Sequence, residues 1–439
     1  MFQILADRTY RHLFLAQVVA LLGTGLATVA LGLLAYDLAG DRAGMVLGTI
    51  FTIKMIAYVG IAPVAGALAD RLPRRRLLVS LDLVRAGVAL LLPFVGAIWQ
   101  IYALIFVLQA ASAAFTPTFQ ATIPDVLPEE GRYTRALSLS RLAYDLENII
   151  SPALAGVLLL ALSYDALFFG TMAGFAASAA LVVSVVLPRA EVAAERRGFY
   201  DRTTRGMRIY LATPRLRGLL ALNLAAAAAG AMVLVNTVVL VRGGLQLGET
   251  AVAVTLGSFG AGSMAAALLL PRLLDRTGDR PVMLAGAGTM ILSLIGLAVA
   301  LTLLGPGWPP LLAAWAVAGL GYAAVLTPSG RLLRRSAHRG DRPAVFAAQF
   351  ALSHACWLLT YPLAGWLMTI GGAVPALAAL AGLAALGAVS ALLLWPARDP
   401  QALPHRHDDL PLDHPHLRGT REHVHDYVID AEHPRWARP

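Results

Sequence analysis

Long apolar stretches alternate with short polar segments along the chain as far as Trp395. A helix that crosses a membrane needs about 20 mainly apolar residues, and twelve stretches meet this requirement, six in each half. The pattern predicts an all-α membrane protein with twelve transmembrane helices. The predicted spans are residues 13–38, 45–68, 77–98, 101–123, 136–162 and 166–187, and then 216–241, 251–270, 282–304, 311–332, 344–368 and 374–395.

Composition supports this fold class and excludes several others. Hydrophobic residues make up 58% of the 439 residues and charged residues only 14%, too few to cover the surface of a soluble protein of this length. The net charge of +9 comes from arginines between the spans, so it reflects topology rather than nucleic-acid binding. A single cysteine, Cys356, excludes an internal disulfide and a thiolate metal cluster.

The distribution of arginines predicts the orientation in the membrane. If the N-terminus is inside, the loops on the external side contain only Arg42 and Arg242, whereas the cytoplasmic loops contain most of the other arginines. Cytoplasmic loops of membrane proteins are enriched in Lys and Arg. We therefore expect a multi-pass protein of the bacterial inner membrane with both termini in the cytoplasm, and we find no cleavable signal in the polar first ten residues.

A polar hairpin motif occurs once in each half. Gly66-Ala67-Leu68-Ala69-Asp70-Arg71 precedes Pro73 and three arginines, and Asp275-Arg276-Thr277-Gly278 follows about two hundred residues later. Such a repeat is typical of transporters built from two homologous halves. The expected units are an N-terminal six-helix bundle (1–187), a cytoplasmic linker (188–215), a C-terminal six-helix bundle (216–395) and a cytoplasmic His-rich tail (396–439).

This repeated motif resembles the loop motif of the major facilitator superfamily, whose members have two six-helix bundles around a central cavity. The resemblance implies a secondary carrier that works by alternating access and does not hydrolyse ATP. No phosphate-binding loop or catalytic triad pattern is present, so we expect no enzymatic activity. In the family the motif residues latch the two halves together in one state, which here implies conformational roles for Gly66, Asp70, Arg71, Arg74, Asp275, Arg276 and Gly278.

The fifth span favours export over uptake. Ser151-Pro152-Ala153-Leu154-Ala155-Gly156 resembles, in degenerate form, the Gly-Pro motif that exporters of the superfamily carry in this helix. Pro152 permits a bend, and small residues such as Gly156 permit close helix packing. Phe106 stands where drug–proton antiporters of the family usually have an arginine, so proton coupling by that route is not supported.

Ionisable side chains within predicted spans are functional candidates, because an unpaired charge in hydrocarbon costs several kcal/mol. Lys54 lies near the middle of the second span, and Asp145, Glu147 and Asn148 lie in the fifth. His354 lies in the eleventh span and is a candidate proton relay or metal ligand. These residues form the expected substrate and proton pathway. The alternatives are structural ion pairs for Lys54 and the acids, and a packing role for His354.

Some of these charges have candidate partners on their own helices. Arg141 and Asp145 are four residues apart, and Asp82 and Arg85 are three apart, so each pair is spaced for a contact within one helix. Arg141 cannot neutralise both Asp145 and Glu147. One carboxylate is therefore expected to be free to carry a proton or to meet Lys54.

The tail differs in composition from the rest of the chain. It contains histidines in His-x-His pairs that recur every nine residues, with aspartates nearby, and imidazoles two residues apart in an extended chain can bind one ion. Without cysteine such a site suits nickel, cobalt or zinc, and the tail resembles those of nickel-resistance exporters of the same superfamily. The alternative is a disordered polar tail without a physiological metal. The candidate metal ligands are His405, His407, His414, His416, His423 and His425.

The sequence thus predicts a secondary active efflux transporter, driven by protons, that exports small toxic compounds. The resemblance extends to the macrolide and enterobactin exporters of the superfamily. The main alternative is an exporter of a divalent transition metal such as nickel or cobalt, with the tail as collector. A third possibility is a transporter-like metal receptor that signals through its tail. The expected partners are the substrate, protons and the lipid bilayer, with no nucleic acid and no bound cofactor other than a tail metal.

Overall fold

The computed structural model describes most of the chain. The described residues are 2–69, 73–129, 132, 136, 139–140, 143, 150–187, 199–338, 341–400, 402–407, 416–417, 420–430, 432–433 and 435–436. The predicted site residues Asp70, Arg71, Asp145, Glu147, Asn148 and His414 lie outside these ranges, as does Arg141.

The N-terminal half is helical throughout its described part. A short 3-10 helix, η1 (Phe2–Ala6), leads into the first long helix, and residues 150–158 form a further helical segment. Short 3-10 turns, η2 (Gly40–Arg42) and η3 (Leu92–Phe94), end two of the long helices. The long helices are α1 (Arg8–Ala39), α2 (Ala43–Ala69), α3 (Arg74–Leu91), α4 (Ile98–Val126) and α6 (Tyr164–Val183).

The C-terminal half begins after α7 (Phe199–Ala212), a helix within the predicted linker. A π-helical turn, η4 (Val239–Gly244), ends α8. Each predicted span except the fifth corresponds to a described helix, and the tenth is divided between two. The helices of this half are α8 (Pro214–Val238), α9 (Glu249–Thr277), α10 (Asp279–Leu304), α11 (Trp308–Leu326), α12 (Ser329–Arg335), α13 (Arg342–Gly371) and α14 (Ala373–Leu394).

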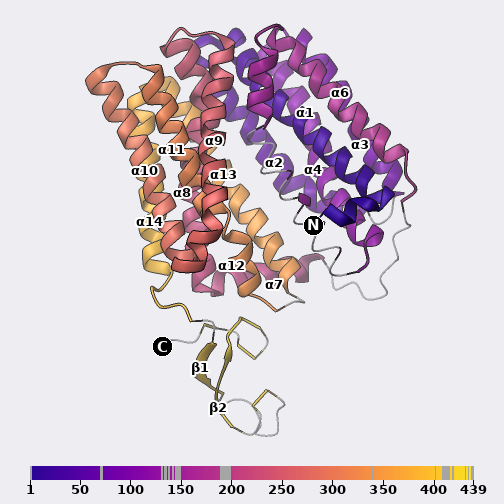
Figure 1. The fold of residues 1–439 in the computed structure, drawn as a ribbon, viewed down its shortest axis with the longest axis vertical. Helices are drawn as coiled ribbons and strands as arrows, with labels where there is room; N and C mark the ends of the chain where they lie inside the picture. Colours follow the sequence, from indigo (N-terminus) through magenta and orange to yellow (C-terminus); the bar gives the residue numbers. More distant parts are fainter. Residues whose placement is uncertain are drawn as a thin grey trace.

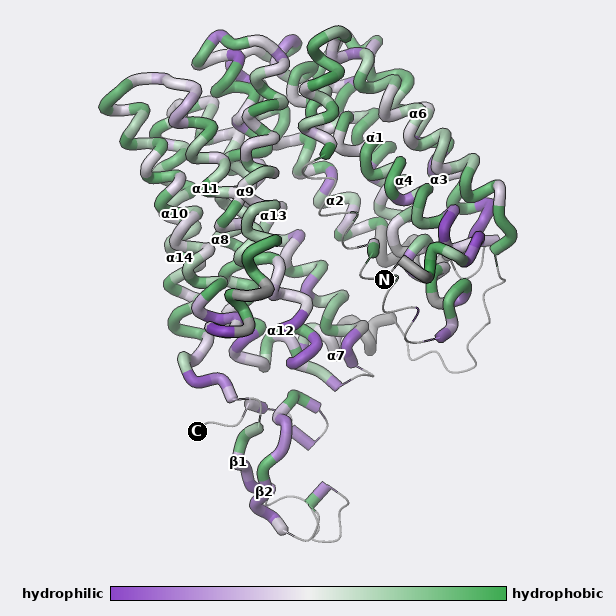
Figure 2. Tube along the Cα trace, in the orientation of Figure 1, coloured by the Kyte–Doolittle hydropathy of each residue, from purple (hydrophilic) through white to green (hydrophobic). Residues whose placement is uncertain are grey.

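The two halves form two helical bundles that lie side by side (Figure 1). We call the end that carries α7, α12 and the tail the tail end, and the opposite end the far end. The bundles are close together at the far end and diverge toward the tail end (Figure 1). Hydrophobic positions follow the long helices, whereas hydrophilic positions gather around α7 and α12 and in the tail (Figure 2). This distribution is that of a membrane-spanning bundle.

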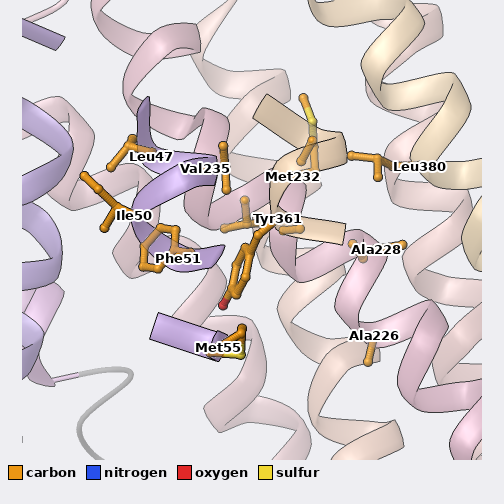
Figure 3. Close-up of a cluster of buried hydrophobic side chains, with 14 of the residues drawn as sticks. Leu47, Ile50, Phe51, Met55, Ala226, Ala228, Met232, Val235, Tyr361 and Leu380 are labelled. Carbon is orange, nitrogen blue, oxygen red and sulfur yellow. The ribbon is translucent and has the colours of Figure 1, made fainter. Parts of the chain in front are cut away.

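A large apolar core lies where α2, α8, α13 and α14 meet. Figure 3 shows the ring of Tyr361 on α13 between Phe51 of α2 and Ala228 of α8, with its hydroxyl directed toward Met55. Phe51 and Tyr361 stack with ring centroids 4.8 Å apart. The core is therefore continuous across the boundary between the halves.

Glycines allow the closest approach of the halves, between α2 and α13. A Cβ atom on Gly48 would lie 2.7 Å from the carbonyl oxygen of Tyr361, and a Cβ on Gly365 would overlap the backbone of Gly44. Helices with small residues at a shared seam bring their backbones into contact. Asn236 of α8 adds a hydrogen bond from Nδ2 to the carbonyl of Ala364 at 3.1 Å.

Charged groups and the fifth span complete the contact between the halves at the far end. Arg242 of the C-terminal half lies 3.8 Å from Asp37 of α1 and 3.8 Å from Glu249 of α9. A Cβ on Gly156 would lie 3.4 Å from the Cβ of Ala253 on α9. The described contacts between the halves are thus concentrated toward the far end.

The described part of the tail is not helical but folds as a β-hairpin. β1 (Ala402–Arg406) and β2 (Glu422–Asp426) are antiparallel, and His405 pairs with His423 in the register. The described residues after the hairpin pack on the tail end of the C-terminal half, because Ile429 is only 2% exposed and belongs to the core, and the Arg215 guanidinium lies 4.9 Å from the Trp436 ring.

Gly48→Ala is expected to destabilise the protein by about 1–3 kcal/mol, because the new methyl group meets a backbone carbonyl that no side-chain rotation moves away. Gly60→Ala, on the same helix but with open space around its Cβ position, is expected to be neutral or to stabilise by up to about 1 kcal/mol. Thermal unfolding of the purified variants in detergent measures both. Equal stability of the two variants would refute a tight seam at Gly48.

Candidate substrate pathway and tail histidine cluster

Aromatic rings line one face of α13. Phe350, His354, Trp357 and Tyr361 recur at spacings of four, three and four residues, which places them on the same side of a helix. The Phe350 and His354 centroids are 3.9 Å apart, and those of Trp357 and Tyr361 are 4.9 Å apart. We call these four residues the α13 strip.

The α13 strip is extended by rings from both halves. Tyr58 of α2 stacks on His354 at 5.7 Å, while Tyr322 of α11 meets Trp357 edge-on at 6.3 Å and packs on Phe259 of α9 at 5.3 Å. Toward the far end Tyr361 is 5% exposed, whereas Phe350 is 39% exposed. The strip therefore runs from the buried seam toward the tail end, where it becomes accessible.

Lys54 lies beside this strip, one helical turn before Tyr58 on α2, and is half-buried. Among the residues that the structure describes, it makes no hydrogen bond and no ion pair. The predicted partners Asp145 and Glu147, and Asn148 on the same span, lie outside the described residues. The α2 side of the strip thus carries a positive charge next to aromatic surface.

His354 is held in one tautomer. Its Nδ1 lies 2.7 Å from the carbonyl oxygen of Phe350, and a carbonyl only accepts, so Nδ1 carries the proton. The Nε2 atom is then left as an acceptor. The structure brings together Lys54 and His354, the two predicted pathway residues that it describes, through the intervening ring of Tyr58.

The predicted gate residues that the structure describes lie near the tail-end turns. Gly66 is in α2, near its C-terminus; Asp275 and Arg276 are in the last turn of α9, and Gly278 ends that helix with a φ of 81°, a conformation that favours glycine. Arg74, at the start of α3, forms an ion pair with Asp125 near the end of α4. In this structure Arg74 therefore connects two helices of its own half.

The C-terminal half contains a matching ion pair with the charges exchanged. Asp279 follows Asp275 by four residues, just as Arg74 follows Asp70 by four. Asp279 begins α10 and accepts hydrogen bonds from Arg331 of α12 at 2.6 and 2.9 Å. Arg335 of α12 also lies 3.9 Å from Asp279. The third and fourth spans of each half are thus joined at the tail end by Arg–Asp contacts, and the polarity of these contacts is opposite in the two halves.

The predicted contact between Asp82 and Arg85 of α3 is present. The two side chains form a buried ion pair, and Ser178 of α6 donates a hydrogen bond to Asp82 at 2.8 Å. The Arg85 guanidinium also lies 4.1 Å from the ring of Phe115. These partners lie inside one half, so the pair stabilises the packing of α3 within the N-terminal half.

Pro152 and Gly156 of the efflux motif lie in the helical segment 150–158. Gly156 faces α9, as its short Cβ distance to Ala253 indicates, and the Leu159 carbonyl that follows accepts a hydrogen bond from Thr250 at 3.4 Å. The motif therefore belongs to the contact between the halves near the far end. This location is suited to residues that control how the two halves separate and close at the far end.

The tail histidines converge on one place. His416 Nε2 lies 3.1 Å from Nε2 of His407, 3.1 Å from that of His423 and 3.2 Å from that of His425. His433 Nε2 lies 3.0 Å from His405 Nε2. The described part of the tail thus forms one cluster of six imidazoles, not separate His-x-His pairs, because the hairpin turns both strands toward the same centre. We call it the histidine cluster.

Three imidazoles of the cluster, those of His405, His407 and His416, lie in surroundings that favour the neutral form. Burial and the neighbouring histidines lower the pKa of His405 and of His416 to about 4, and the same causes lower the pKa of His407. Burial opposes ionisation of Asp430, but the hydrogen bonds and charge of His433 and a hydrogen bond from His338 lower its pKa below the usual range. Neutral imidazole is the form of histidine that binds metals.

Sequence reasoning missed two sets of residues. The α13 strip has a signal in the sequence, the 4-3-4 spacing of Phe350, His354, Trp357 and Tyr361, but that spacing is equally typical of core packing. His433 and Asp430 belong to the histidine cluster without any His-x-His spacing. Only the fold of the hairpin brings them to it.

Comparison with known proteins identifies the family. The sequence model of the Major Facilitator Superfamily matches residues 13–301 and 220–415. The chain therefore belongs to this superfamily of membrane transporters, which carry small molecules across a membrane, and it is a multi-pass membrane protein rather than an enzyme.

Relatives of this chain include exporters. Macrolide efflux protein A of Streptococcus pyogenes is 24% identical over 178 residues, 39% of this chain and 43% of that protein. The transporter YfiS of Bacillus subtilis (strain 168), named only as a member of the superfamily, is 30% identical over 179 residues, 40% of this chain and 42% of its own length. The chain thus matches about two fifths of the length of these relatives.

Solved structures confirm the predicted fold class. The nucleoside transporter NupG superposes with a TM-score of 0.67 at 13% identity, covering 88% of this chain and 98% of that one. A bacterial homologue of the human lysosomal transporter Spinster, in an inward-facing and occupied conformation, gives a TM-score of 0.67 at 11% identity over 88% and 96% of the two chains. At these identities the likeness establishes the fold alone.

The exchanged polarity of the two Arg–Asp pairs gives a direct test of their role. Arg74→Asp is expected to destabilise the N-terminal half, because two carboxylates then face each other, and adding Asp125→Arg is expected to restore most of the loss by recreating the polarity seen in the C-terminal half. Thermal unfolding of the single and double variants measures a coupling free energy of roughly 1–3 kcal/mol. Additive effects of the two substitutions would exclude a direct pair.

Proposed function

We propose that this protein is a secondary active exporter of small toxic organic compounds in a bacterial inner membrane, with its tail end in the cytoplasm and transport driven by the proton gradient. The proposed class of substrate rests on one observation, the α13 strip with Lys54 beside it. Aromatic faces bind flat apolar groups, and an ammonium that has no ion-pair partner among the described residues favours neutral or anionic compounds over a bare cation. The names of the macrolide and multidrug relatives support export.

The orientation is supported by the arginines of the tail end. Arg74, Arg75 and Arg76 at the start of α3 and Arg331, Arg334 and Arg335 of α12 all lie there. Only Arg42 and Arg242 lie in the far-end turns that the structure describes. An excess of arginine marks the cytoplasmic side of a membrane protein.

With this orientation the structure corresponds to an inward-facing state. The far end is held by the glycine seam of α2 and α13 and by the contacts of Arg242, while the bundles diverge toward the cytoplasm (Figure 1). A compound enters from the tail end and reaches the α13 strip from its exposed Phe350. Export then requires the seam to open and the tail ends of the two halves to close.

A divalent metal is the second candidate substrate, favoured by the histidine cluster. The cluster lies on the cytoplasmic side in the proposed orientation and offers only nitrogen ligands, which suit zinc, cobalt, nickel and copper. Lys54 argues against this substrate, because a cation that passes along the α13 strip meets a like charge. The two candidates therefore differ in whether the cluster or the strip determines resistance.

Growth of an efflux-deficient bacterial host is the first test. Cells that express the full chain or a chain ending at Pro400 are exposed to graded macrolides, aromatic toxicants, nickel, cobalt and zinc. Ending at Pro400 retains Asp399, whose side chain contacts Arg335 at 2.7 Å and Arg215 at 3.4 Å. Resistance to organic compounds that survives truncation supports the proposal, whereas resistance to metals alone, lost on truncation, would replace it with metal export.

Two phenylalanines of α13 provide a matched pair of variants. Phe350→Ala is expected to raise the half-saturating concentration of an exported aromatic compound about three- to ten-fold, as the loss of a ring contact worth about 0.5–1.5 kcal/mol implies. Phe346→Ala, one turn away and equally exposed but outside the described ring contacts, is expected to leave it unchanged. Uptake into inverted membrane vesicles measures both, and equal effects would remove the strip from the substrate pathway.

Proton coupling is testable in the same vesicles. Transport of the exported compound is expected to stop when a protonophore collapses the pH gradient and to continue when ATP is withheld while an artificial pH gradient is applied. Transport that persists without any ion gradient would contradict secondary active export.

A further inference from the structure

The histidine cluster presents more lone pairs to one point than hydrogen bonds can satisfy. Nε2 of His416 lies within 3.2 Å of three other Nε2 atoms, those of His407, His423 and His425. A ring nitrogen carries either one proton or one lone pair, so this atom pairs with only one of the three. Unpaired lone pairs that face each other repel, and a cation at their centre removes the repulsion.

The other ring nitrogens fix which atoms face the centre. Nδ1 of His405 lies 2.9 Å from the Leu403 carbonyl, Nδ1 of His425 lies 2.8 Å from the Asp426 carbonyl, and Nδ1 of His433 lies 2.7 Å from Asp430 Oδ1. Since these oxygens accept, the Nδ1 atoms carry protons, and in each ring that is neutral the Nε2 atom keeps its lone pair. Metal-binding histidines are oriented by acceptors of this kind.

The spacing of the nitrogens fits a transition-metal ion. Four nitrogens about 2.0–2.1 Å from a tetrahedral zinc are roughly 3.3 Å from one another, and the observed Nε2 separations of 3.0 to 3.2 Å lie a few tenths of an ångström below this. Two overlapping quartets have ligand atoms within 4.8 Å of one another, and both include His405 and His416. Because one imidazole lone pair binds one metal, the shared ligands limit the cluster to one four-coordinate ion.

A chain of hydrogen bonds leads from the cluster to the membrane part. Asp430 accepts from the ring and the backbone N–H of His433, each at 2.7 Å, and its other oxygen lies 3.1 Å from Nε2 of His338. His338 lies between α12, which carries Arg331 and Arg335, and α13, which carries the aromatic strip. His433 is thus both a cluster member and, through Asp430, an attachment to the transporter.

We propose that the histidine cluster binds a single divalent transition-metal ion and that binding fixes the tail against the tail end of the C-terminal half through His433, Asp430 and His338. The site is regulatory, and it does not depend on the transported compound. Bound metal holds His433 in place, His433 orients Asp430, and Asp430 restrains the segment between α12 and α13. Those helices carry the tail-end ion pair and the substrate strip, so metal shifts the balance between the two states of the carrier.

Metal binding is measured first, on the purified full chain in detergent, by titration with Zn²⁺ and with Co²⁺, whose visible absorption reports its coordination. One ion per chain is expected. His416→Gln is expected to weaken binding at least ten- to a hundred-fold, and His12→Gln, a histidine outside the cluster that contacts Ser184, is expected to leave it unchanged. A double variant, His405→Gln with His416→Gln, that binds Zn²⁺ as tightly as the natural chain would overturn the site.

Attachment is measured separately with two spin labels in a Cys356→Ser background. One is placed at Val424→Cys, which is 64% exposed, and the other at Arg334→Cys on the exposed face of α12. Zn²⁺ is expected to narrow the distance distribution between them. In His338→Gln, which removes no cluster ligand, Zn²⁺ affinity is expected to persist while the narrowing is lost. Equal narrowing in both proteins, or none in either, would overturn the attachment.

Discussion

The backbone contact between α2 and α13 is the constraint on which the rest of the structure depends. Two bundles in a membrane gain little hydrophobic free energy from each other, because lipid is as apolar as their surfaces, so van der Waals contact must hold them together. Gly44, Gly48 and Gly365 make that contact possible. Its position toward the far end leaves the tail ends of the bundles free to diverge, which defines the state of the carrier seen here.

The same contact between α2 and α13 also determines where the proposed substrate surface lies. Tyr361 sits at its edge, and the α13 strip continues from Tyr361 to Phe350, so the surface proposed to bind substrate begins where the halves separate. Each half is stiffened by its own Arg–Asp pair at the tail end, Arg74 with Asp125 and Asp279 with Arg331. Because the described contacts between the halves gather toward the far end, opening them would move the whole strip with the C-terminal half.

The tail adds a second feature, the histidine cluster, which does not depend on the contact between α2 and α13. Its hairpin gathers six imidazoles and joins them through Asp430 to His338, on the half that carries the strip. We propose that imidazole nitrogens at this spacing form a site for a metal ion. A transporter of organic compounds with a cytoplasmic metal site would link export to the metal status of the cell.

The sequence by itself determined the fold class, the approximate bounds of the described spans and the arginine asymmetry, because a membrane demands long apolar helices and each is recognisable locally. It also indicated the pairing of Asp82 with Arg85, which lie on one helix. It did not reveal the partner of Arg74, the α13 strip as a surface, or the place of His433 in the cluster. These depend on contacts between residues far apart in the chain, and only the tertiary structure decides which of many apolar and charged faces meet.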